Sequence, residues 1–138
     1  MADERISDDE IVYRRIPSVL PFFEEPDRIT SQNFKLDRRR GDRGLSVYRR
    51  SIVSAEDVLR KPDAVAESRI AEAQVGDIRS LTGGDGKTLA LDVIVVDDEQ
   101  NPGHSEIRGP IPSELSSSAS KALQRLFRLL PLLPIQNE

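Results

Sequence analysis

The stretch LALDVIVV, residues 89–96, is the most apolar run of the chain and the strongest indication of its fold. Its length and its β-branched residues predict a strand over residues 88–96. A continuous apolar run indicates a strand that is covered on both faces, as in the middle of a sheet. A polar turn with Asn-Pro-Gly before His104 follows, and residues 105–108 are expected to return as a short strand.

An amphipathic helix near the C-terminus supplies a second layer. Three serines, residues 116–118, offer N-caps, and Pro131 marks the end. Between them apolar residues recur at helical spacing: Ala119, Ala122, Leu123, Leu126, Phe127 and Leu130. We expect this stripe to pack on the apolar strand, so that one core contains Val93, Val95, Leu123, Leu126 and Phe127.

The segments that precede these two elements are expected to form shorter ones. Ser54 and Asp57 resemble a capping box and indicate a short helix. A second helix is expected from Pro62 to Gly76, because proline suits the first helical position and glycine the end. Short strands are expected over residues 11–16, 29–36, 45–48 and 78–81. Together these elements predict an α+β fold, with a small mixed or mainly antiparallel sheet and a packed C-terminal amphipathic helix.

Length and composition indicate one domain. The chain has 138 residues, no cysteine and a net charge of −4. We expect a flexible acidic arm over residues 1–10 and a single α+β domain over residues 11–138. The start lacks the basic and apolar regions of a signal peptide, and no apolar run approaches the roughly 20 residues that span a bilayer. These features predict a soluble, cytoplasmic protein without a membrane span.

His104 is the only histidine of the chain. On a strand, His104 and Glu106 would point to the same side, because side chains alternate. Imidazole and carboxylate are groups that catalyse proton transfer near neutral pH, so both are candidate catalytic residues. The alternative is that His104 only closes a turn.

Arg14 is the second candidate. Tyr13 and the two adjacent arginines Arg14 and Arg15 fall on a short strand, so one of the two arginines faces the covered side of the sheet. An inward arginine needs a carboxylate or phosphate partner. The two interpretations are therefore a structural ion pair and a clamp for an anionic ligand.

Metal and nucleic acid are both disfavoured by the residues present. His104 has no second histidine or cysteine with which to bind zinc, and the acidic run 97–99 is typical of a solvated loop, so no metal site is expected. Residues 28–50 form a basic block that includes Arg38, Arg39 and Arg40, which could contact nucleic acid. The block lacks the aromatic platform of a single-strand binder and any DNA-binding motif.

Four motifs resemble those of a group of small bacterial proteins to which no activity is assigned. The motifs are YRRIP at residues 13–17, ITSQNF at 29–34, GLSV at 44–47 and NPGH at 101–104. The chain also resembles, more weakly, the RES-type and ADP-ribosyltransferase-like toxins. That resemblance implies NAD as cofactor, with Tyr13 and Arg14 on a ligand-binding strand, Arg14 on the phosphates, Ser31 or Ser46 on a following strand, and Glu106 on the nicotinamide ribose.

Two functional hypotheses follow. The first is a small accessory or protein-interaction module without a cofactor, of the kind encoded beside a bacterial toxin or defence partner. The second is an NAD- or nucleotide-using enzyme with Arg14 and His104 in one cleft. The two differ in a spatial requirement, because only the enzyme needs Arg14, Ser46 and His104 to converge.

Overall fold

In the described part of the chain, six strands form one antiparallel sheet in the order β6-β7-β4-β1-β5-β8. The computed structural model describes residues 5–17, 23–25, 28–36, 41–60, 68–96 and 99–131. The strands of the sheet are β1 Ile11–Pro17, β4 Leu45–Arg49, β5 Ser68–Gln74, β6 Asp92–Val95, β7 His104–Arg108 and β8 Arg128–Leu129. The α+β fold with an antiparallel sheet is confirmed.

Short helices and a two-stranded ribbon complete the described part of the chain. The helices are α1 Ala55–Leu59, α2 Val75–Arg79, α3 Ser117–Leu126 and the 3-10 helix η1 Ser31–Phe34. The ribbon pairs β2 Phe23–Glu25 with β3 Arg28–Ile29. No helix of the described residues is long and apolar enough to cross a membrane.

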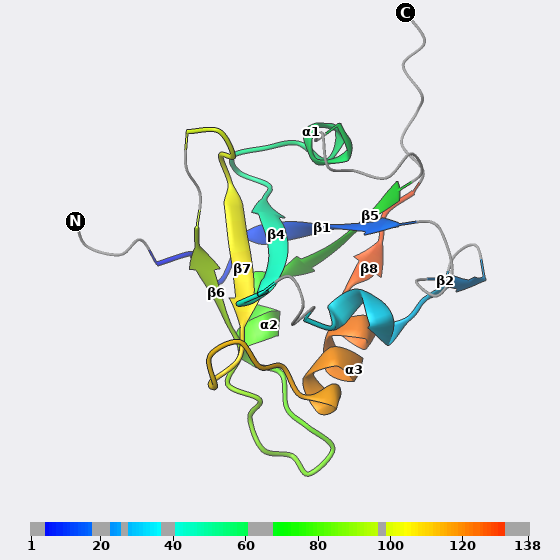
Figure 1. Ribbon diagram of the computed structural model, residues 1–138, viewed down its shortest axis with the longest axis vertical. Helices are drawn as coiled ribbons and strands as arrows, with labels where there is room; N and C mark the ends of the chain where they lie inside the picture. Colours follow the sequence, from blue (N-terminus) through cyan, green and yellow to red (C-terminus); the bar gives the residue numbers. More distant parts are fainter. Residues whose placement is uncertain are drawn as a thin grey trace, which may run out of the picture.

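The sheet is strongly twisted and covered differently on its two faces. In Figure 1, β7 and β4 run nearly vertically while β1 runs across the view. Val12 packs in the cluster that contains Leu123 of α3, whereas its neighbour Tyr13 packs with Val58 of α1. Because neighbouring strand residues point to opposite faces, α3 and α1 cover opposite faces. The face with α3 holds the main core. On the other face α1 lies against β1 and β5, and its Val58 belongs to a second cluster with Tyr13 and with Tyr48 of β4.

The expected core is present, with two of its members at its margin. Val93, Leu123 and Phe127 are buried in the main cluster. Val95 and Leu126 are only half-buried and pack against that cluster from outside. The rings of Phe34 and Phe127 lie 5.1 Å apart between centroids and join η1 to the end of α3. The core therefore forms between the sheet, α3 and η1.

The serine caps predicted for two helices are confirmed. Ser54 Oγ accepts a hydrogen bond from the Asp57 N–H, and Asp57 accepts one in return from the Ser54 N–H, which completes a capping box at α1. Ser116 Oγ accepts from the Ala119 N–H at 3.1 Å and begins α3. α3 ends at Leu126, before the predicted end, because the next residues become extended and pair with β5 as β8.

The apolar run forms a strand at the edge of the sheet, so the prediction of a central strand covered on both faces is wrong. β6 begins only at Asp92, since Ala90 has a left-handed φ of +52°. Val93 is buried against the core, whereas Ile94 on the other face is only half-buried. Apolar composition indicated burial correctly on one face, but it cannot distinguish a central strand from an edge strand.

Three other local predictions are wrong, and the cause is clear for the first. Residues 68–74, expected in a helix, form β5; residues 75–79, where a strand was expected from residue 78, form α2; and residues 31–34 form η1 within an expected strand. β5 pairs with β1 along its whole length, from Ile11 with Gln74 to Pro17 with Ser68. This distant pairing outweighs the local helix propensity of the alanine and glutamate residues in β5.

The N-terminal segment is docked over residues 5–10, where a flexible arm was expected. Ile6 is fully buried in the main core, and Arg5 forms a β-bridge with Ile94 of β6. Residues 1–4 lie outside the described residues, as do the expected helix start at Pro62, the basic residues Arg38 to Arg40, and the acidic residues Asp97 and Asp98.

Candidate functional site

Alternate residues of β4, β7 and β6 line a part of the α1 side of the sheet that is exposed or half-buried among the described residues. Ser46 lies opposite Glu106, which in turn lies opposite Ile94. Residues opposite each other in a sheet point to the same face. We call the set Ser46, Ile94, His104, Glu106 and Arg108 the open face; these side chains are exposed or half-buried. Their neighbours Val47, Val93 and Ile107 point the other way, into the core.

Ser46 and His104 are in contact at the centre of the open face. His104 Nε2 lies 3.1 Å from Ser46 Oγ, a hydrogen-bond distance, and the tautomer decides which of the two donates. The imidazole ring also packs on Tyr48, with 5.4 Å between ring centroids. Serine and histidine in contact can exchange a proton with each other or with a bound group.

The turn before β7 fixes where the imidazole points. Gly103 has a φ of +80°, a backbone conformation that residues other than glycine rarely adopt. The His104 N–H donates a hydrogen bond to the Asn101 carbonyl at 3.3 Å. A Cβ on Gly103 would also lie 3.3 Å from Ile52. The Asn-Pro-Gly-His sequence therefore serves to start β7 with its imidazole on the open face.

Glu106 forms an ion pair with Arg108. Arg108 donates to Glu106 Oε1 from Nε at 3.0 Å and from Nη2 at 2.8 Å. The two residues are two apart on β7 and so lie on the same face. This ion pair lies beside Ser46, which is opposite Glu106 in the sheet. It fixes the Glu106 carboxylate and the Arg108 guanidinium in place on the open face.

Arg14 lies on the opposite face of the sheet from His104. Its Nε donates to the Asn33 carbonyl and its Nη1 to the Ser46 carbonyl, both at 2.7 Å, and the guanidinium lies 5.7 Å from the centroid of the Phe34 ring. Burial lowers the pKa of Arg14 to about 10, although the charges of Asp42 and Tyr48 act in the other direction. An inward arginine was expected with a carboxylate or phosphate, but here two backbone carbonyls and an aromatic ring hold it.

The structure therefore brings together Ser46, His104 and Glu106, and separates them from the other candidates. Ser31 begins η1 on the α3 side of the sheet. Tyr13 shares the face of His104 but is buried under α1. Arg14 and His104 thus point to opposite faces of the sheet in the described part of the chain, and Glu106 lies on the face of His104.

Sequence reasoning missed Tyr48 and Arg108 as members of this site. Tyr48 packs under the imidazole, and strand alternation in residues 45–48 already places it on the face of Ser46. Arg108 was only the expected end of a strand. Its spacing of two from Glu106 was the signal available in the sequence.

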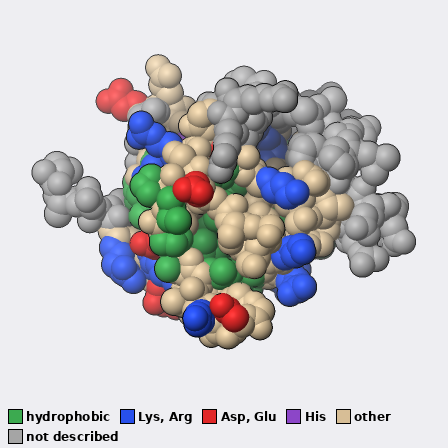
Figure 2. All heavy atoms as spheres, turned by 60° about the horizontal axis from the view of Figure 1, so that its bottom comes forward, with side chains coloured by type: hydrophobic (Ala, Val, Ile, Leu, Met, Phe, Trp, Pro, Cys, Tyr) green, Lys and Arg blue, Asp and Glu red, His purple; other side chains and the backbone are tan. Residues whose placement is uncertain are grey.

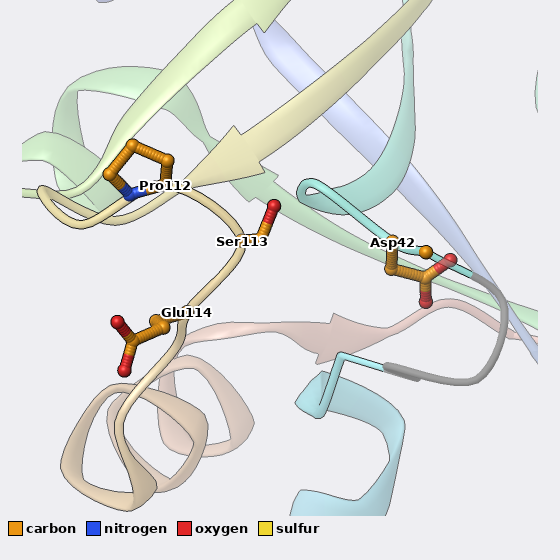
Figure 3. Close-up of a pocket in the computed structure, with 5 residues that line it drawn as sticks. Asp42, Pro112, Ser113 and Glu114 are labelled. Carbon is orange, nitrogen blue, oxygen red and sulfur yellow. The ribbon is translucent and has the colours of Figure 1, made fainter.

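A hollow of about 450 Å³ lies away from these residues, between two loops. It is lined by Gly41, Asp42, Pro112, Ser113 and Glu114. Figure 3 shows the two loops facing each other across it, with the Glu114 carboxylate pointing away from Asp42. None of the candidates from sequence lines this hollow. Within the described residues, no three His, Cys, Asp or Glu side chains group closely enough to hold a metal ion.

Figure 2 shows apolar side chains gathered on one part of the face in view, with acidic and basic side chains around them.

Comparisons with protein-family models, curated proteins and solved structures find no match to this chain.

Proposed function

We propose that the chain is a protein-interaction module that binds its partner through the open face. The contact between Ser46 and His104 carries this proposal. A hydroxyl and an imidazole are held 3.1 Å apart on a sheet surface beside the paired Glu106 and Arg108. These groups are fixed by strand backbone and by each other, so that little side-chain entropy is lost when a partner binds.

The mixed chemistry of the open face favours a protein over a small molecule. Small ligands bind in concave, mainly apolar pockets, whereas protein interfaces combine apolar contacts with hydrogen bonds on flatter surfaces. Ile94 supplies an apolar contact, and Ser46, His104, Glu106 and Arg108 supply donors and acceptors. The partner surface is expected to carry complementary hydrogen-bonding groups, including an acid opposite Arg108. The resemblance to small bacterial proteins and toxins suggests a toxin or defence partner in the cytoplasm.

Site-directed photo-crosslinking tests this proposal. A photoreactive amino acid is placed in the full chain at Ser46 or, as a control, at Lys121, which is exposed on α3. We expect one protein to be captured from Ser46 and not from Lys121. Binding of that purified protein should weaken by about ten-fold or more in His104→Ala and Arg108→Ala, and stay unchanged in Lys121→Ala. Equal capture from both positions, or unchanged binding in His104→Ala and Arg108→Ala, would contradict the proposal.

A serine-reactive fluorophosphonate distinguishes binding from catalysis. If Ser46 acted as a nucleophile with His104 as base, the probe would label Ser46 in wild type and lose that labelling in His104→Ala. We expect no labelling of Ser46, because the interaction module needs no activated hydroxyl. Labelling that depends on His104 would replace the interaction module with a serine enzyme.

A further inference from the structure

Residues 5–8, which we call the N-terminal strap, lie along the outer edge of β6. Arg5 forms an antiparallel bridge with Ile94, and Ile6 is fully buried in the main core. Asp8 binds Arg79 of α2, with 2.6 Å between Oδ1 and Nη1. A short peptide segment is thus bound by the rest of the fold through backbone, apolar and charged contacts.

Each contact selects one property of the segment. The buried position of Ile6 requires a bulky apolar side chain. Arg79 Nη1 donates both to the Ile6 carbonyl and to the Asp8 carboxylate, at 2.6 Å each, which favours an acid two residues after the apolar one. The Gly76 N–H donates to the Asp8 carbonyl at 2.9 Å. A Cβ at Gly76 would lie 3.0 Å from the Asp8 Cβ, so glycine admits the close approach.

The same arginine also binds Asp92 at the outer edge of β6. Arg79 Nε donates to Asp92 Oδ1 at 2.7 Å, and that oxygen accepts the Val93 N–H at 2.8 Å. The Val93 N–H is therefore occupied by a side chain rather than by another strand. Unoccupied edge strands add strands from other chains, and natural proteins protect them with such local devices. Arg79 joins the strap to this protected edge.

We propose that this edge is a second docking site, which binds an extended segment of a partner protein in place of the strap. The segment carries a bulky apolar residue followed two positions later by Asp or Glu, as Ile6 and Asp8 do. The site adjoins the open face at Ile94, whose backbone pairs with Arg5 of the strap, and it does not depend on the function of the open face. The tethered strap competes at an effective concentration in the millimolar range, so a partner must pair with more of β6 than Arg5 does.

A peptide with the sequence of residues 2–10 tests this site in the full chain. The chain variant Ile6→Ala weakens the strap in place, and fluorescence anisotropy measures the binding of labelled peptide. We expect the peptide to bind Ile6→Ala at least about ten-fold more tightly than wild type, because truncation of a buried isoleucine weakens the competing strap. The chain variant Val58→Ala is the matched control, since Val58 is fully buried in the other cluster; it should bind no better than wild type.

Two further peptides test the selected properties. Peptides carrying Ile6→Ala or Asp8→Asn should each bind the Ile6→Ala chain about ten-fold more weakly than the natural peptide. A folded Ile6→Ala chain that binds none of them, or binds all three equally, would overturn the proposal. Should circular dichroism show that Ile6→Ala is unfolded, the chain variant Asp8→Asn, which keeps Ile6, replaces it. The natural peptide should then bind this chain more tightly than wild type, and equal binding would overturn the proposal.

Discussion

The Nη1 of Arg14 donates a 2.7 Å hydrogen bond to the carbonyl of Ser46, the residue whose hydroxyl contacts His104 on the other face of the sheet. A single residue of β4 thus joins the buried arginine to the open face. The role of Arg14 that follows is structural, because it fixes the backbone beneath the Ser46 hydroxyl.

We expect Arg14→Met to lower the free energy of unfolding by about 2–4 kcal/mol. The substitution removes two charge-assisted hydrogen bonds and leaves the Asn33 and Ser46 carbonyls without their side-chain donor. Urea denaturation followed by circular dichroism measures the change. Arg60→Met, at an exposed arginine, is the control and should change stability by less than about 0.5 kcal/mol. Equal effects of the two substitutions would contradict a structural role for Arg14.

The helix α3 offers a test of where the core lies. Leu123 is fully buried, whereas Leu126, three residues later, is half-buried. Leu123→Ala should cost about 2–5 kcal/mol and Leu126→Ala less than about 2 kcal/mol, because the second site has less apolar area to lose. Thermal or urea unfolding of both variants measures the two losses in the free energy of unfolding. A larger loss of stability in Leu126→Ala than in Leu123→Ala would contradict the position of Leu123 in the core.

Acid should weaken the fold through Glu10 and Asp92. Burial raises the pKa of Glu10, but hydrogen bonds from Ser51 and Arg49 outweigh it, so the pKa lies below the ordinary 4.5. Burial likewise raises the pKa of Asp92, and the bonds from Arg79 and Val93 bring it below 3.8. Carboxyl groups with lowered pKa stabilise the fold fully above the pKa of the unfolded chain and lose this effect as pH falls through the folded pKa.

We therefore expect the free energy of unfolding to fall as pH drops below about 4.5, with a slope that the double variant Glu10→Gln, Asp92→Asn reduces. Urea denaturation at a series of pH values measures both slopes. An unchanged slope in the double variant would show that other carboxyl groups cause the acid sensitivity.

Gly44 allows β4 to approach β7. A Cβ on Gly44 would lie 2.6 Å from the Ile107 carbonyl oxygen and 2.9 Å from Arg108 and Glu106 side-chain atoms. Gly44→Ala should therefore destabilise the fold by about 2 kcal/mol or more and shift the His104 ring resonances in NMR spectra. Gly84→Ala is the control, since no atom lies within 4 Å of its added Cβ, and should be close to neutral. A stable Gly44→Ala with unshifted His104 resonances would contradict this account.

Local patterns were sufficient wherever one segment determines its own structure. The capping box of Ser54, the Ser116 cap with its apolar stripe, and the alternation in residues 45–48 each predicted the observed element. The same alternation correctly put His104 and Glu106 on one face. It also required one of the adjacent arginines to point inward, and that residue is Arg14.

Distant pairing explains what the sequence could not predict. β5 is a strand because β1 pairs with it, and β6 is an edge strand because of the order in which other strands join. The contact between Ser46 and His104 depends on the register of β4 and β7, and the separation of Arg14 from His104 depends on both strands belonging to one sheet. No local pattern encodes a register between segments more than 50 residues apart.

The position of β1 has a consequence for how the chain reaches this structure. β1 precedes its partners β4 and β5 in the chain, and β8, the last strand of the described sheet, joins β5 after the others. Such non-local pairing predicts slow folding, on the order of milliseconds to seconds. On the ribosome, β1 must wait unpaired while its neighbours are synthesised, at about 5–20 residues per second. During those seconds the nascent chain is most exposed to chaperones and proteases, and a partner present at synthesis can meet it before the sheet closes.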